Sequence, residues 1–170
     1  WGDLNGDGFI DLYVAGYEGP GAGVDRILRN NGGSGFSLAW SQSSERAARG
    51  VTTADFDEDG DIDVYASNYR LQANHLWRNN GNFTFQDAAS SLGVAGGAHT
   101  IGSAWGDINN DGWVELAVGS RGYSAEIGAV YLLHLNADLG CENGICVDAG
   151  TSGSQCQCAD DSLADTCSEP

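Results

Sequence analysis

The sequence of 170 residues contains no methionine and no lysine, and it has only two prolines. Because lysine is absent, seven arginines face 24 acidic residues, and the net charge of -17 excludes the basic surface that a nucleic-acid-binding protein needs. Apolar runs are only a few residues long, so we expect no membrane insertion. The 26 glycines do not recur at every third position, which excludes collagen and favours a turn-rich all-β chain. Without methionine, the chain is expected to be processed or part of something longer.

Sequence signatures of catalysis are also missing. There is no Gly-x-Ser-x-Gly elbow and no glycine motif that would cradle a phosphate. His75, His99 and His134 are scattered without metal-binding spacing, which favours structural roles over zinc. We therefore expect that the protein is not an enzyme and that its partners include cations.

A repeat of 52 residues organises most of the chain. An acidic segment that begins at Asp3 recurs at Asp55 and at Asp107. The words Arg-Asn-Asn-Gly follow in the first two units, ending at Gly32 and Gly81. The predicted units are about 1–49, 50–98 and 99–139, followed by a cysteine-rich tail at 140–170.

Within each unit the apolar residues alternate with a period of two, which predicts β-strands. The middle unit predicts four of them, at about 50–54, 61–67, 74–79 and 82–87, with connections at 41–49 and 87–96 that can hold a helical turn. Four strands per 52 residues is typical of a β-propeller blade. The first unit lacks the strand before its acidic loop, and the third shows no clear strand after Leu135.

The acidic loops predict three Ca²⁺ ions per chain. A hard cation takes six to eight oxygens, and alternate oxygen-bearing side chains on a tightly turning loop converge on one point. Such side chains occupy positions 1, 3, 5 and 9: Asp3, Asn5, Asp7 and Asp11; Asp55, Asp57, Asp59 and Asp63; Asp107, Asn109, Asp111 and Glu115. Position 7 can add its main-chain carbonyl, at Phe9, Asp61 and Trp113, and position 6 is glycine throughout.

Two other interpretations of the acidic loops compete with a calcium site. An EF-hand needs a bidentate Glu at position 12 and flanking helices, whereas these loops have Val14, Ala66 and Val118 there and are flanked by strands, so an EF-hand is rejected. The other alternative is that Asp, Asn and Gly serve only to form turns. Three copies in register favour the cation.

The acidic segments with their flanks, Trp1–Leu12, Ala54–Val64 and Trp105–Leu116, resemble FG-GAP/VCBS repeats, the blades of integrin-alpha-type β-propellers. The segment from Leu76 to Gly81, followed by Phe83–Asp87, is also typical of that group. The resemblance covers about residues 1–139. It implies calcium in the blade loops and a role in adhesion, recognition or extracellular structure. Closed propellers of this family usually have seven blades, and this chain offers fewer than three full ones.

The tail has the spacing C-x4-C-x9-C-x-C-x8-C and resembles the last five cysteines of an epidermal-growth-factor-like module. By that resemblance Cys141 pairs with Cys156 and Cys158 with Cys167, which leaves Cys146 unpaired or linked to another chain. An irregular tail with another pairing stays open. Disulfides of either kind imply an oxidising, extracellular compartment.

Two further features bear on an extracellular role. Asn82 begins an Asn-Phe-Thr glycosylation sequon in a predicted turn, although the repeat also favours Asn there for the turn itself. Trp40, Trp77 and Trp113 could serve as platforms for sugars, but packing between blades is favoured.

These observations predict a calcium-stabilised, secreted or cell-surface structural or adhesion protein. We expect identical chains to associate head to tail, because an open series of blades leaves apolar faces and strand edges to be covered. The rival to a polymer is a fragment of one longer closed propeller. Glycans or other extracellular proteins are further possible partners, and the alternative function is a carbohydrate-binding module or the non-catalytic propeller of a secreted enzyme.

Overall fold

The structure is a computed structural model that describes residues 1–16, 23–43, 46–96, 99–110, 112–121, 128–133, 144–148, 154–158 and 163–164, with side chains described as far as residue 120. Every strand pairing in it is antiparallel, and the described residues contain no helix. Accordingly, no described segment forms an apolar helix of the length that a membrane crossing needs. The all-β prediction is confirmed.

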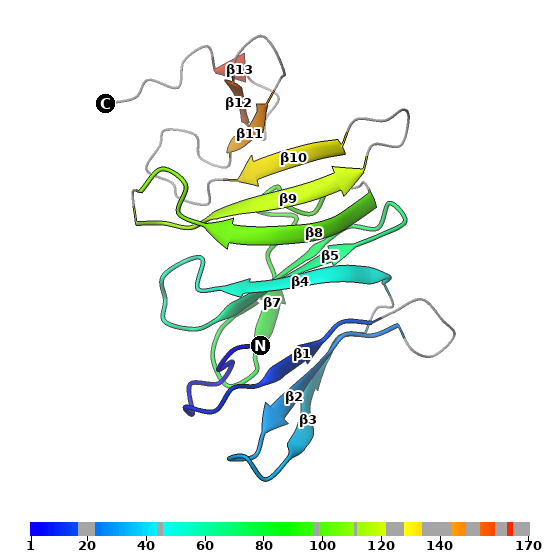
Figure 1. The fold of residues 1–170 in the computed structure, drawn as a ribbon, viewed down its shortest axis with the longest axis vertical. Coiled ribbons are helices and arrows are strands. Elements are labelled where there is room, and N and C mark those ends of the chain that lie inside the picture. Colours follow the sequence, from blue (N-terminus) through cyan, green and yellow to red (C-terminus); the bar gives the residue numbers. More distant parts are fainter. Residues whose placement is uncertain are drawn as a thin grey trace.

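Three sheets follow one another along the chain and stack along the long axis of the molecule (Figure 1). The first has the order β1-β2-β3, and the second has the order β4-β5-β6-β7. The third continues as β8-β9-β10-β11-β12-β13. The strands are β1 Leu12–Val14, β2 Arg26–Asn30, β3 Phe36–Ser41, β4 Ala48–Ala54, β5 Asp63–Asn68, β6 His75–Asn79, β7 Phe85–Asp87, β8 His99–Gly106, β9 Glu115–Arg121, β10 Gly128–Leu133, β11 Gly144–Asp148, β12 Ser154–Cys158 and β13 Leu163–Ala164.

The core lies between the sheets, and strand alternation decides which side chain faces which neighbour. In β5, Val64 and Ala66 pack toward the first sheet, while Tyr65 packs toward the third. All three are fully buried because the second sheet is covered on both faces. The first interface holds Leu4, Tyr13, Ile27, Val64, Ala66 and Trp77, and the second holds Phe56, Tyr65, Leu76, Ala88, Ala89, Val94, Leu116 and Val118.

The predicted strands of the middle unit are found with small shifts at their ends. The largest is at the last strand, which begins at Phe85 because Asn82 and Phe83 adopt positive φ in the turn before it. Between 88 and 94 the chain makes one helix-like turn, in which the Leu92 amide donates to the Ala88 carbonyl at 3.1 Å. This is the helical turn expected at 87–96.

The ends of the repeat region behave differently from each other. Gly2 forms only an isolated bridge with Asp11, so the first sheet lacks a full fourth strand, as expected. The third unit does have a strand after Leu135, because β11 pairs with β10 in the fourth position of its sheet. The expectation of a missing strand there is wrong. The strand was missed because its residues, Gly144–Asp148, belong to the segment that the cysteine spacing assigns to the tail.

Candidate metal centre

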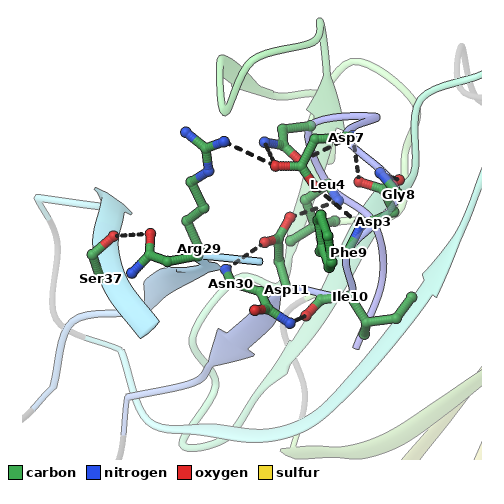
Figure 2. Close-up of polar contacts among 12 residues, drawn as sticks. Asp3, Leu4, Asp7, Gly8, Phe9, Ile10, Asp11, Arg29, Asn30 and Ser37 are labelled. Carbon is green, nitrogen blue, oxygen red and sulfur yellow. Dashed lines mark hydrogen bonds and ion pairs between the residues drawn. The ribbon is translucent and has the colours of Figure 1, made fainter. Parts of the chain in front are cut away.

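Each acidic loop lies before the second strand position of its sheet, between β4 and β5 in the second sheet and between β8 and β9 in the third. The first Asp of each loop stabilises the turn. Asp3 accepts hydrogen bonds from the amides of Asp7 at 3.0 Å and Gly8 at 2.8 Å (Figure 2). Asp55 repeats this pattern with Asp59 and Gly60, at 3.1 and 3.0 Å. In the third loop Asp107 accepts from the Gly112 amide at 3.0 Å.

The glycine at position 6 is required by the backbone of the turn. Gly8, Gly60 and Gly112 have φ of +86°, +93° and +96°, in the left-handed region that L side chains rarely adopt. Turn formation therefore accounts for the first Asp and the glycine of each loop without any ion.

The carboxylate at position 9 joins the loop to the strands. Asp11 is buried and accepts hydrogen bonds from the amides of Leu4, at 3.0 Å, and Asn30, at 2.8 Å (Figure 2). Asp63 does the same with Phe56 and Asn79, at 3.0 and 2.8 Å. Glu115 accepts from the Ile108 amide at 2.7 Å. These residues were predicted as metal ligands, and the structure gives them a bracing role as well.

The second loop brings carboxylates together most closely. One oxygen from each of Asp55, Asp57 and Asp63 lies within 4.8 Å of the others, and this is the one such group within the described part of the chain. Both oxygens of Asp57 are buried, and the Arg78 guanidinium lies beside them, with Nη2 2.5 Å from Oδ2. Three carboxylates thus converge with one guanidinium beside them, and a cation shared by these carboxylates fits the cluster of oxygens.

Burial, with smaller contributions from neighbouring carboxylates, raises the pKa of two aspartates in this loop. Burial raises the pKa of Asp63 to about 7, although two backbone amides stabilise its charged form. Burial also raises the pKa of Asp57, with Asp59 and Asp55 acting in the same direction and Arg78 opposing them. In the exposed first loop, by contrast, hydrogen bonds from Asn5 and the Phe9 amide, together with Arg29, lower the pKa of Asp7. A divalent cation would relieve the repulsion in the second loop.

The remaining predicted ligands are placed only in part. The first loop holds Asp3, Asn5, Asp7 and Asp11, but its carboxylates do not converge within 4.8 Å as those of the second loop do. In the third loop Asp107, Asn109, Trp113 and Glu115 are described, whereas Asp111 lies outside the described residues. Asp59 and Asp61 lie in the second loop and contact each other, because the Asp61 amide donates to Asp59 at 3.0 Å.

The other predicted sites divide into those that the structure describes and those that it does not. Asn82 is exposed in the turn between β6 and β7, a position compatible with a glycan. Cys141 and Cys167 lie outside the described residues, as does His134. Cys146 and Cys156 occupy opposite register positions on β11 and β12, and Cys158 ends β12; the disulfide pairing stays a prediction.

Aromatic side chains serve packing, as favoured for tryptophan. Trp40 lies 5.0 Å from Trp77 and 5.4 Å from Phe85, measured between ring centroids, and so joins the first two sheets. His75 is buried, stacks on Trp77 at 4.5 Å and places Nδ1 2.6 Å from an Asp87 oxygen. The histidine therefore has the structural role predicted from its spacing.

Sequence reasoning missed two arginines that contact the loops. Arg29 Nη2 lies 2.9 Å from Asp7 Oδ2, and Arg78 Nη2 lies 2.5 Å from Asp57 Oδ2 (the first pair is drawn in Figure 2). Both arginines belong to the repeated Arg-Asn-Asn-Gly words. That recurrence was the available signal, but it was interpreted only as a marker of the strand and turn.

Comparison with known protein families gives two overlapping matches to the FG-GAP-like repeat, at residues 3–66 and 55–118. The two matches begin at the first Asp of the first and second loops, so they reproduce the 52-residue spacing. No curated protein matches the chain. Together the family matches cover residues 3–118, which is more than half of the sequence, and they fall on the stacked antiparallel sheets just described. The chain belongs to the FG-GAP-like repeat family and carries blades of the integrin-like propeller type.

Proposed function

We propose that this protein is a calcium-stabilised structural or adhesion module of an extracellular protein, without an enzymatic role. The observation that carries the proposal is the convergence of Asp55, Asp57 and Asp63, with both Asp57 oxygens buried beside the Arg78 guanidinium. Repeats of this family often bind calcium and are typical of extracellular proteins. Oxygen ligands of this kind suit Ca²⁺, which would neutralise carboxylates that otherwise repel one another.

The same proposal extends to three ions per chain, because the first and third loops share the spacing of the second. Asp55, Asp57, Asp59 and Asp63, with the Asp61 carbonyl, would hold the ion of the second loop. Since position 9 also accepts amide hydrogen bonds from two strands, an ion held there would brace the blade and not only the loop. Three bound Ca²⁺ ions add +6 and change the net charge from -17 to -11.

Calorimetric titration and thermal melting with and without a chelator test the calcium proposal. Wild-type protein should bind calcium and melt higher with it, at affinities of roughly 10⁻⁴ to 10⁻³ M, typical of extracellular sites. Asp55→Asn should lose the second-loop ion. Glu58→Gln is the matched control, because Glu58 lies in the same loop, is exposed and occupies no predicted ligand position. Absence of bound calcium and a melting temperature indifferent to chelator would contradict the proposal.

Self-association is proposed from the outer face of the first sheet. Each later sheet buries the corresponding positions against the sheet before it: Val64 and Ala66 are 0% exposed, and Leu116 is 0% exposed. In the first sheet the equivalent of Ala66, Val14, is 38% exposed. A sheet of the same kind fits this apolar face, and we propose that a second copy supplies it, head to tail.

Sedimentation in calcium tests this assembly. Higher species that dissociate in Val14→Asp, but not in a surface variant such as Gln86→Asp, would support head-to-tail association. A stable, well-folded monomer in calcium would reject the polymer and favour a blade set completed within a longer polypeptide. The carbohydrate-binding alternative predicts glycan binding that needs an exposed tryptophan. Trp40 and Trp77 pack in the first inter-sheet core, so the structure gives that alternative less support.

A further inference from the structure

The two arginines that contact the acidic loops occupy the same place in their blades. Arg29 is the next-to-last residue of β2, and Arg78 is the next-to-last residue of β6. In each case the following asparagine donates its amide to the position-9 carboxylate at 2.8 Å. That hydrogen bond fixes the end of the strand beside the loop. The arginine, one residue earlier on the strand, therefore lies next to the loop in both blades.

Each arginine contacts a carboxylate at a ligand position. Arg78 contacts Asp57, at position 3 of the second loop. In the first loop position 3 is Asn5, which carries no charge, and Arg29 contacts Asp7 at position 5 instead. Asn5 Nδ2 also donates to the same Asp7 oxygen at 2.9 Å. The guanidinium therefore reaches a carboxylate in both loops although the loop sequences differ.

We propose that Arg29 and Arg78 are built-in counter-ions that hold the first two loops folded without calcium and set a weak calcium affinity. The inference rests on the proposed calcium function and concerns residues that are not ligands. A guanidinium on a loop carboxylate offsets the repulsion among the acidic groups when no ion is present. When calcium binds the same carboxylates, its double charge is repelled by the arginine. One contact thus stabilises the metal-free state and disfavours the loaded one.

The third repeat supplies an internal comparison. Leu28 and Trp77 pair with Leu12 and Val64, the first residues after position 9 of their loops, and an arginine follows Leu28 and Trp77 in the sequence. In the third repeat Leu133 pairs with Leu116, and the residue that follows Leu133 in the sequence is His134. No arginine is encoded at this position, so the third loop should bind calcium independently of the two substitutions below.

Calorimetric titration of the full chain with CaCl₂ tests the proposal in Arg29→Gln and Arg78→Gln. In each variant the loop that lost its arginine should bind calcium roughly three- to tenfold tighter, because a positive charge a few ångströms from a divalent ion is removed. The effect stays modest because both arginine side chains are about half exposed to solvent. The gain should shrink as salt is raised. Arg78→Lys, which keeps the charge, should stay close to wild type. Arg26→Gln controls for net charge, because Arg26 lies three residues before Arg29 on β2, about 10 Å away.

Thermal melting in chelator provides the second readout. Each Arg→Gln variant should melt lower than wild type in chelator and gain more than wild type on adding calcium. A merely structural arginine would lower both melting temperatures equally, and that result, or unchanged or weaker calcium binding, would overturn the inference while leaving the calcium function standing. If wild type and variants all fail to bind calcium, the proposed function fails with it.

Discussion

The junction between the first two sheets contains a buried hydrogen-bond chain whose loss can be measured. Trp77 Nε1 donates to the Tyr13 hydroxyl at 2.9 Å, and that hydroxyl donates to Asp25 Oδ2 at 2.5 Å. Asp25 is 1% exposed. Burial and the adjacent Asp25 raise the pKa of Tyr13 well above its ordinary value, so the phenol stays a donor to the carboxylate.

Tyr13→Phe keeps the buried ring and removes only the hydroxyl. Two buried groups then lose a partner. The Asp25 carboxylate loses the hydroxyl donor and keeps the Gly16 amide, at 2.6 Å, and the Trp77 indole N–H loses its acceptor. An unsatisfied buried polar group costs about 1–3 kcal/mol, and more when charged, so we expect a loss of about 2–4 kcal/mol in the free energy of unfolding.

Tyr65 provides a matched control, because it occupies the same position in the second sheet. It is fully buried, and its hydroxyl donates to the neutral Val94 carbonyl at 2.9 Å. Tyr65→Phe should therefore cost less than Tyr13→Phe, about 1–2 kcal/mol, because the buried acceptor that loses its donor is a neutral carbonyl and not a carboxylate. Urea denaturation of both variants in the same calcium concentration gives the comparison.

A double-mutant cycle sharpens the test. If Tyr13 acts through Asp25, the combined Tyr13→Phe/Asp25→Asn variant should lose less than the sum of the single changes, by more than about 0.5 kcal/mol. The reasoning is refuted if Tyr13→Phe costs no more than Tyr65→Phe, or if the two single changes are additive.

Three other predictions concern sites away from this junction. Partial burial would raise the pKa of Asp87, but His75 and backbone amides outweigh it, so the pKa is lowered. The stability advantage of wild type over Asp87→Asn should therefore be present above pH 3.8, the ordinary pKa, and be lost as pH falls through the lowered pKa. Denaturation measured as a function of pH checks this. Gly60→Ala should cost about 1–2 kcal/mol, because φ is +93° there, whereas Gly102→Ala, at ordinary φ with open space, should cost less; thermal melting compares them. Non-reducing mass spectrometry should find at least two disulfides among the five tail cysteines, Cys141, Cys146, Cys156, Cys158 and Cys167. Five free thiols would contradict this.

Local patterns predicted the blade and its loop, while contacts between distant residues remained outside their reach. The alternation around Val64 places its strand and both of its faces, and the spacing from Asp55 defines the loop. The contact between Tyr13 and Trp77, 64 residues apart, has no local signature, because a hydroxyl and an indole become partners only when two sheets stack. The same holds for Arg78 and its loop, since the ion pair depends on the register of β6.

The loops are also joined to one another across the sheet interface, which gives an ion in one loop a route to the next blade. Asn79 is fully buried and donates from Nδ2 to the Ile62 carbonyl of its own blade, at 3.0 Å, and to the Leu4 carbonyl in the first acidic loop, at 2.9 Å. Its amide meanwhile donates to Asp63. Position 9 of the second loop and the backbone of the first loop therefore share one side chain. Fixing the second loop fixes a hydrogen-bond donor for the first, so ordering of the loops and packing of the blades stabilise each other.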